Sequence, residues 1–227
     1  MRTARLAGVI SALALLLMTV GCASLITGTA VARKQVSGAG VALADDGNGV
    51  VLGTIQDGAP AAVDIFIEPQ CPHCGYFVAE YGDAIAKYLA TNRLTITIRP
   101  LTFLDHGSDD YSARATNAIF LVAADDKATP SLVWSFIQRL YATLLSTRSL
   151  ANDDGIAQVA NDVGVSANTV NRIAAAEPEV DADEVNDGNL AVMDTYGVEP
   201  ATPAVYDTVG EVEVDSSIPN WLDELVK

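Results

Sequence analysis

The chain has 227 residues, of which half are hydrophobic and 19% are charged, so it can bury a core and lacks the composition of a disordered protein. The formal net charge of −16 leaves no basic face for phosphates, which excludes nucleic acid as an expected partner. We interpret the excess of acid as a surface that keeps the protein soluble.

The N-terminal segment predicts export. Arg2 and Arg5 precede an apolar run over residues 6–20, which ends in small residues and Cys22. A basic start, a short apolar stretch and small residues at its end are typical of a signal peptide. The run is too short and wrongly flanked for a membrane span. We therefore predict a signal peptide over residues 1–21.

Met18-Thr19-Val20-Gly21-Cys22 resembles the lipobox of bacterial lipoproteins, although Thr19 stands where Leu is favoured. The resemblance implies that Cys22 carries lipid and anchors the protein to the extracytoplasmic face of the cell membrane. The alternative is an ordinary secretory signal and a secreted protein. Residues 22–47 are rich in Ala, Gly and Val without a clear period, which predicts a tether between membrane and domain.

The first strands of the folded part are expected from residue 48 onward. Val50-Val51-Leu52-Gly53 is a short apolar run, and Asp57-Gly58-Ala59-Pro60 is a strong turn signal. Residues 61–67 form a nearly continuous apolar run, interrupted by Asp64. This run predicts a buried central strand.

A pair of cysteines follows this strand directly, as Cys71-Pro72-His73-Cys74. From Cys74 to about Ala90, apolar residues recur at spacings of three and four, which predicts an amphipathic helix. Residues 94–98 then alternate with a period of two, which predicts a half-buried strand ending at Pro100.

The next segment predicts helices without a strand between them. The expected helical stretches are Ala115–Ala124, Leu132–Leu145, Ile156–Val163, Val170–Ala176 and Leu190–Tyr196. Asp153 and Ser166 are expected N-caps, and Gly164 is an expected helix stop.

Strands return after Pro203, at residues 204–206 and 211–214, and residues 218–226 predict a short amphipathic helix. The order of elements predicts an α/β protein: a thioredoxin fold with an inserted helical domain. Its first part spans residues 48–106, the insertion 107–197 and the second part 198–227. The second part must pack against the first, because alone it could not bury its apolar faces.

The spacing of the two cysteines suits thiol–disulfide exchange. At a helix N-terminus, Cys71 faces unpaired N–H groups and the positive end of the helix dipole, and both lower the pKa of its thiol. Pro72 fits the first helical position, where no N–H is needed. His73 adds positive charge or a donor, which favours an oxidising pair. Cys74, one turn further, is expected to be more buried and to act as the resolving thiol.

Other uses of the pair fit less well. A zinc site needs further ligands, and the mature chain adds only His73 and His106, so we predict no metal. We interpret His106 as a surface or capping residue. A purely structural disulfide would close a short loop and remove little chain entropy. With Cys22 lipidated, the remaining cysteines form one pair. We therefore expect a redox-active Cys71–Cys74 disulfide and no cofactor.

Residues 48–227 resemble the DsbA-like thiol–disulfide oxidoreductases of the thioredoxin superfamily. The likeness rests on the strand and Cys-Pro-His-Cys motif at residues 63–75 and on residues 109–118, which resemble the start of that family's helical insertion. The tetrapeptide is the form associated with strongly oxidising members. The resemblance also implies a cis-proline beside the dithiol, and Thr202-Pro203 matches it. The backbone of Thr202 would then pair with an extended substrate.

The sequence departs from this family at one place. Many members carry a buried acid six residues before the first Cys, thought to help proton transfer, and here that residue is Ile65. Asp64 should face the other side of the strand. We interpret Glu68 as a solvated loop charge rather than a proton carrier, which leaves the proton path open.

The resemblance implies a membrane-tethered oxidase that donates its disulfide to exported proteins with reduced Cys pairs. A membrane partner would then reoxidise it. Three alternatives stay open. The same fold could act as a reductase or isomerase, although nothing resembles an added dimerisation domain. The chain could be a copper-binding lipoprotein that uses Cys71, Cys74 and a His. It could also be a non-enzymatic binding lipoprotein with a vestigial disulfide.

Overall fold

The computed structural model describes residues 40–53, 61–107 and 109–227. The predicted signal peptide, the predicted lipidation site Cys22 and the turn signal at residues 57–60 lie outside these ranges. Among the helices of the described ranges, none combines the length and apolar character that crossing a membrane requires.

The described residues form one mixed sheet of six strands in the order β1-β2-β4-β3-β5-β6. The two central strands, β3 and β4, are parallel to each other, and every other neighbouring pair is antiparallel. The strands are β1 (Val41–Leu43), β2 (Val50–Leu52), β3 (Ala62–Ile67), β4 (Thr95–Pro100), β5 (Ala204–Asp207) and β6 (Val212–Val214).

Strand β3 is the central element that leads to the two cysteines. All its residues except Ala62 are buried, which confirms the predicted buried strand. Helix α2 (Pro72–Ala90) starts with Pro72 at its first position, as expected, and returns the chain to β4. Parallel strands need such a crossover, and their C-terminal ends lie at the same edge of the sheet. The cysteines follow the end of β3 directly, so they lie at the edge where the C-terminal ends of β3 and β4 meet.

The prediction that residues 22–47 form a tether is wrong for the last part of that range. Residues 41–43 form strand β1, which pairs with β2 from Val41↔Leu52 to Leu43↔Val50. Val41 is buried in the core. A three-residue strand has too few side chains to show a period, so only its pairing with β2 identifies it.

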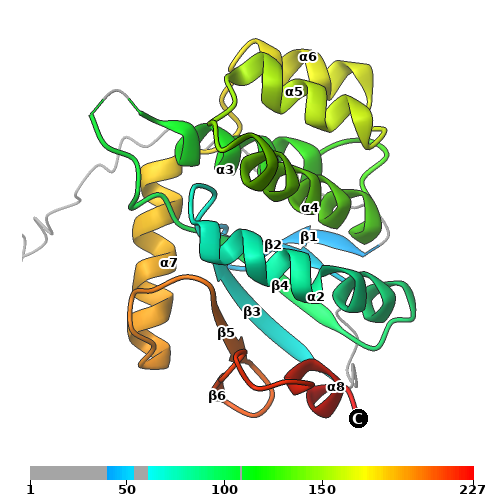
Figure 1. Ribbon diagram of the computed structural model, residues 1–227, viewed down its shortest axis with the longest axis vertical. Coiled ribbons are helices and arrows are strands. Elements are labelled where there is room, and N and C mark those ends of the chain that lie inside the picture. The colour runs from blue at the N-terminus through cyan, green and yellow to red at the C-terminus, as the bar shows by residue number, and fades with distance from the viewer. Residues whose placement is uncertain (1–39, 54–60, 108) are drawn as a thin grey trace, which may run out of the picture. The chain divides into compact units, whose positions relative to one another are not determined.

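Five helices follow β4: α3 (Tyr111–Ala123), α4 (Pro130–Thr147), α5 (Asp153–Asp162), α6 (Ala167–Ala174) and α7 (Ala182–Tyr196). Helix α4 lies along α2, and α5 and α6 lie at the end of the molecule opposite the C-terminal helix (Figure 1). The indole N–H of Trp134 in α4 donates to the carbonyl of Gly82 in α2 at 2.9 Å. The N-cap of α5 is Asn152 rather than the expected Asp153, whereas Ser166 caps α6 as expected.

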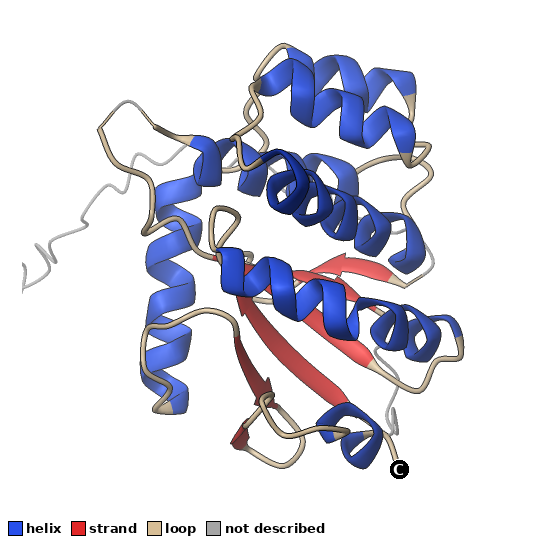
Figure 2. Ribbon diagram, in the orientation of Figure 1, coloured by secondary structure: helices blue, strands red, loops and turns tan. Residues whose placement is uncertain are grey.

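The C-terminal segment returns to the first half of the chain, as expected. Strand β5 pairs with β3, with Val205 opposite Ile65. Helix α8 (Trp221–Leu225) places the Trp221 ring 6.1 Å from Phe77 and 5.5 Å from Tyr81, both in α2. Figure 2 shows the sheet with helices on both sides, which is the layered α/β arrangement.

A buried ion pair joins β3 to β4 and contacts α7. The Arg99 guanidinium is 2.5 Å from Asp64 and 2.8 Å from Asp46, and Arg99 and Asp64 are both buried. The side-chain oxygen of Asn189 in α7 accepts from Arg99 at 3.1 Å, and the Tyr196 hydroxyl donates to Asp64 at 3.0 Å. Each charge is therefore paired and hydrogen-bonded, as a buried charge requires.

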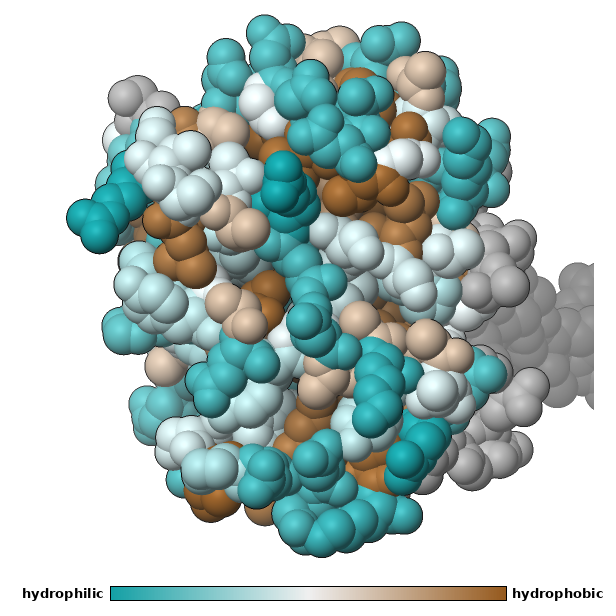
Figure 3. Space-filling model, turned by 45° about the vertical axis from the view of Figure 1, so that its right-hand side comes forward, coloured by the Kyte–Doolittle hydropathy of each residue, from teal (hydrophilic) through white to brown (hydrophobic). Residues whose placement is uncertain are grey.

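The face drawn in Figure 3 is mostly hydrophilic and is broken by separate hydrophobic patches rather than one continuous apolar surface. Among the described residues, the large apolar side chains that stay exposed are Tyr76, Phe103, Val209, Val212 and Ile218. Single exposed apolar residues of this kind are normal on a folded protein.

Candidate active site

Cys71 and Cys74 lie at the N-terminus of α2 and differ in their access to solvent. Cys71 is the N-cap and is 7% exposed, whereas Cys74 is fully buried. Both are free thiols, so the structure shows the dithiol form of the pair. An incoming thiol can therefore reach Cys71 and not Cys74, which is the order of burial expected from the sequence.

The surroundings of Cys71 favour a thiolate. The pKa of this thiol is lowered from 9.0 to about 5, chiefly because the Cys74 thiol donates a hydrogen bond to it. The main-chain N–H groups of Cys74 and His73 and the side chain of Thr202 add to the lowering, against the opposing effect of burial. These main-chain donors exist because the first turn of a helix leaves its N–H groups unpaired.

The surroundings of Cys74 favour the thiol. Burial raises its pKa far above the ordinary value, and the nearby Cys71 raises it further. The main-chain N–H of Glu68 lies 3.5 Å from Cys74 Sγ. Tyr141 of α4 is fully buried beside the same sulfur and donates its hydroxyl to the carbonyl oxygen of Glu68 at 3.0 Å. Cys74 is thus enclosed by residue 68 on one side and α4 on the other.

His73 acts on Cys71 through its main chain. Its N–H is one of the groups that lower the pKa of Cys71, whereas its side chain is exposed and makes an edge contact with Tyr76 at 6.4 Å between ring centroids. The main chain of His73 therefore supplies a donor to the thiolate, and the expected contribution of its imidazole stays a prediction.

A substitution separates these two contributions. His73→Ala keeps the main-chain donor, so we expect it to raise the pKa of Cys71 by less than about one unit, or about 1.4 kcal/mol. The thiolate absorbance of the reduced protein, followed against pH, measures this shift. A shift of about two units or more would assign the thiolate to the imidazole instead.

Thr202 and Pro203 lie against the dithiol. The peptide bond between them is cis, which confirms the geometry that the resemblance implied. The carbonyl oxygen of Thr202 is 3.6 Å from Cys71 Sγ, and Thr202 and Pro203 are both partly exposed. Pro203 immediately precedes β5, so the pairing of β5 with β3 holds this segment beside the cysteines.

Glu68 is the residue whose prediction from the sequence is wrong. It is not a solvated loop charge, because it is fully buried and its carboxylate accepts from the main-chain N–H of Gln70 at 2.7 Å and from the Ser112 hydroxyl. Burial raises its pKa from 4.5 to about 7. Ser112 belongs to α3 and lies 44 residues away along the chain, so no local pattern could have indicated this contact.

The other candidates have structural roles. Asp64 is buried but pairs with Arg99, and Ile65 is fully buried in the core. His106 is exposed, as expected. No group of three or more His, Cys, Asp or Glu side chains within the described ranges is arranged to hold a metal ion.

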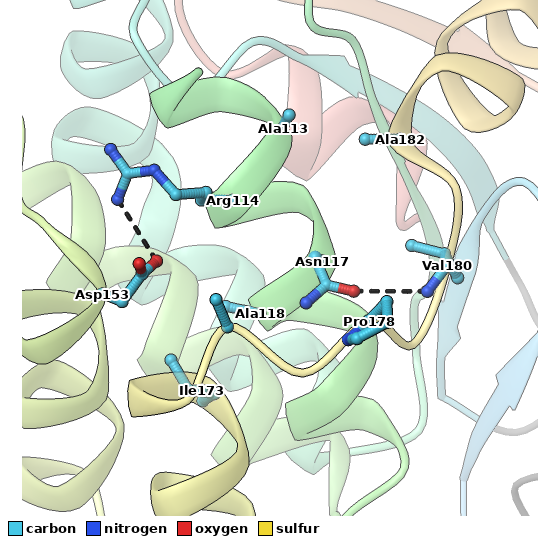
Figure 4. A pocket seen from close by; sticks show the side chains of 10 residues that line it. Ala113, Arg114, Asn117, Ala118, Asp153, Ile173, Pro178, Val180 and Ala182 are labelled. Carbon is cyan, nitrogen blue, oxygen red and sulfur yellow. Dashed lines mark hydrogen bonds and ion pairs between the residues drawn. The ribbon is translucent and has the colours of Figure 1, made fainter. Parts of the chain in front are cut away.

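A pocket of about 210 Å³ lies away from the dithiol, between α3, α6 and the segment before α7 (Figure 4). Its polar side chains are already paired with other groups of the protein. Arg114 pairs with Asp153 at 3.4 Å, and the side-chain oxygen of Asn117 accepts from the main-chain N–H of Val180 at 3.2 Å. None of the lining residues belongs to the cysteine motif, so this pocket is not part of the candidate active site.

Comparison with known proteins places the chain in a family. The family model described as thioredoxin matches residues 45–227. The chain belongs to the thioredoxin family. Its sequence is also 31% identical over 192 residues to the serine/threonine-protein kinase PknE of Mycobacterium tuberculosis. That match covers 79% of this chain and 31% of the kinase, so this thioredoxin-family chain spans about a third of the length of the curated relatives it matches.

Solved structures of the family share the fold. The thiol-disulfide oxidoreductase MdbA of Corynebacterium diphtheriae is 22% identical, with a TM-score of 0.69, over 81% of this chain and 91% of that protein. The M. tuberculosis DsbG is 21% identical, with a TM-score of 0.63, over 80% of this chain and 87% of that protein. The reduced DsbA of the same organism is 20% identical, with a TM-score of 0.63, over 80% of this chain and 91% of that protein. The predicted thioredoxin fold with helices inserted after β4 is therefore confirmed.

Proposed function

We propose that the chain is a thiol–disulfide oxidoreductase that donates the Cys71–Cys74 disulfide to dithiols of other proteins. The observation that carries this proposal is that the surroundings of the two sulfurs have opposite effects. Cys71 is reachable and is stabilised as a thiolate, whereas Cys74 is buried and is stabilised as a thiol. A good leaving thiolate at the reachable sulfur and a protected resolving thiol are what disulfide exchange requires.

The direction of exchange follows from the same feature. A pKa of about 5 for Cys71 stabilises the reduced form, because the thiolate exists only when the disulfide is open. Each unit of lowering makes the pair more oxidising by roughly 30 mV. Oxidation of substrates is therefore favoured over their reduction or isomerisation. The similar solved proteins, named as a thiol-disulfide oxidoreductase and a disulfide bond oxidoreductase, support the same class of reaction.

The substrates in this proposal are exported proteins with reduced Cys pairs, and a membrane protein reoxidises the enzyme. No cofactor takes part beyond the disulfide itself. The location is the extracytoplasmic face of the cell membrane, through lipid on Cys22, with secretion as the alternative. This location is supported by the export signal in the sequence and by the oxidising conditions that a stable disulfide donor needs.

Refolding of a reduced, disulfide-dependent protein tests the activity. The oxidised wild type should restore activity to the reduced substrate, and Cys71→Ser should lower the rate to that of the uncatalysed reaction. Cys74→Ser cannot hold the disulfide and should not donate it either. When its Cys71 is first activated as a mixed disulfide with an aromatic thiol, a reduced substrate with a single Cys should displace that thiol and stay joined to Cys71, visible as a covalent adduct on a non-reducing gel, because neither protein has a second thiol to resolve it. Equal activity of the wild type and Cys71→Ser would rule out the proposal.

The alternatives give different results in two further measurements. A reduction potential near that of a cytosolic reductant, about −270 mV, together with an ordinary pKa for Cys71, would favour a reductase. Titration of the reduced protein with Cu(I) against a competing thiol tests the copper-binding alternative. The disulfide-donor proposal predicts a potential well above that value and no Cu(I) binding that survives the competitor.

A further inference from the structure

The buried carboxylate of Glu68 has surroundings that a purely structural acid does not need. Residue 68 contacts both sulfurs of the site: its N–H lies 3.5 Å from Cys74 Sγ, and its carbonyl oxygen accepts from the N–H of Cys71 at 2.9 Å. Its carboxylate has no cation partner among the described residues, in contrast to Asp64, which is paired with Arg99. Ionisation of a buried carboxyl without a cation partner costs free energy, which raises its pKa toward neutral pH. At that pH the carboxyl can both give and take a proton.

The titratable groups around residue 68, counting both its side chain and its main chain, come from four parts of the chain. Cys71 and Cys74 stand at the start of α2, Asp105 lies in the loop after β4, Tyr111 belongs to α3 and Tyr141 to α4. Of these, burial raises the pKa of Tyr111 to about 12 and holds that of Tyr141 well above its ordinary value, so neither phenol loses its proton near neutrality.

A second carboxylate, that of Asp105, holds the arrangement in place. Asp105 accepts from the side chain of Gln70 at 2.5 Å and from the main-chain N–H groups of Ser112 and Ala113, both at 2.8 Å. It therefore fastens the first turn of α3 to the loop that precedes the cysteines. The Ser112 hydroxyl in that turn is thereby directed at Glu68.

We propose that Glu68 carries the proton that Cys74 must gain and lose during exchange. This inference rests on the proposed function. When a substrate thiolate attacks Cys71 Sγ, the bond between Cys71 and Cys74 breaks and its electron pair goes to Cys74 Sγ. The proton of the Glu68 carboxyl moves to that sulfur, and the resulting carboxylate regains a proton from water. In reoxidation, the ionised Glu68 takes the proton from Cys74, whose sulfur then attacks Cys71 Sγ; the bond between Cys71 and the reoxidising partner breaks, and the partner leaves as a thiolate.

The need for such a carrier follows from the burial of Cys74. A thiolate at a fully buried sulfur is strongly disfavoured, so its formation without a proton would slow the opening of the disulfide. Solvent has no direct access to this sulfur. A group that is half protonated near neutral pH serves both directions, which is the condition for efficient acid and base catalysis.

The test is the rate at which dithiothreitol reduces the oxidised protein, stopped by acid and followed by alkylation, across a range of pH. The variant Glu68→Gln keeps the size and the acceptor for Ser112 but carries no exchangeable acid proton. The titration of dithiothreitol is common to both proteins and cancels in the ratio of their rates. We expect the ratio of wild type to Glu68→Gln to be about a hundredfold below pH ~6 and to fall toward unity above pH ~8.

Ser112→Ala provides a matched second variant. The hydrogen bond from Ser112 lowers the pKa of Glu68, so its removal should move the inflection of the rate profile to higher pH without abolishing it. A purely structural effect of either substitution would change the rate by the same factor at every pH. A constant ratio for Glu68→Gln with exchange intact would overturn the inference and leave the proposed function standing. Loss of exchange in the wild type itself would instead overturn the proposed function.

A measurement on the wild type does not depend on the folding of a variant. The infrared band of a protonated carboxylic acid in the oxidised protein should disappear with a midpoint at or slightly below about pH 7, since the Cys71 thiolate that raises this pKa is absent from the disulfide. A spectrum without an acid band above pH ~5.5 would contradict the inference, because ordinary surface carboxyls have lost their protons there.

Discussion

Acidification should remove most of the advantage in stability that reduced wild-type protein holds over Cys71→Ser. The pKa of Cys71 falls from 9.0 in an unperturbed thiol to about 5 in the folded protein. Between these two values the unfolded chain holds the proton and the folded chain does not, so a fall in pH favours unfolding. The stabilisation is complete above about pH 9 and is lost at about pH 5; from pH ~7 to pH ~5 the loss is roughly 2–3 kcal/mol.

Denaturant unfolding of both reduced proteins at several pH values measures this effect. Comparison with Cys71→Ser is needed because other groups titrate in the same range. Glu68, whose pKa is raised, has the opposite sign: its contribution is present below about pH 4.5 and is lost as the pH rises through about 7. It is present in both proteins and largely cancels. A difference between the two proteins that does not change with pH would contradict a thiolate at Cys71.

Arg99→Met should be the most destabilising substitution outside the active site. It leaves Asp64, which is 3% exposed, as a buried charge without its 2.5 Å partner. Removal of one member of a buried pair costs about 3–5 kcal/mol. The double variant Arg99→Met/Asp64→Asn should regain part of this loss, because no uncompensated charge is left. Thermal and denaturant unfolding of the two variants provide the comparison.

Arg172→Met is the matched control. Arg172 also pairs with two carboxylates, Glu177 and Glu179, both at 2.7 Å, but its side chain is 26% exposed and Glu177 is half exposed. We expect a loss of less than about 1 kcal/mol, since solvent screens such pairs. An equal loss for Arg99→Met and Arg172→Met would show that burial does not set the cost of breaking these ion pairs.

The local patterns of the sequence were sufficient for most of the fold. A continuous apolar run predicted β3, and apolar residues at spacings of three and four predicted α2. Both patterns are local because they follow from which side chains of one element are buried. The motif from Cys71 to Cys74 carries its chemistry within four residues. Thr202-Pro203 was found through a family resemblance and not through any period in the chain.

The failures have a common physical cause, which is contact between segments that the local pattern of neither segment reports. Glu68 is followed by Pro69 and resembles a loop charge, but it is buried and is contacted by Ser112 and Tyr141 from the insertion. Strand β1 is too short to show a pattern and is defined by its partner β2.

The unequal exposure of the two sulfurs has a kinetic consequence for the proposed exchange. Cys71 is the sulfur that solvent reaches, so a substrate and a reoxidising partner must use the same atom at different times. The two half-reactions therefore alternate, and neither partner can react until the other has been released. Steady-state rates should follow ping-pong kinetics, with parallel lines in double-reciprocal plots.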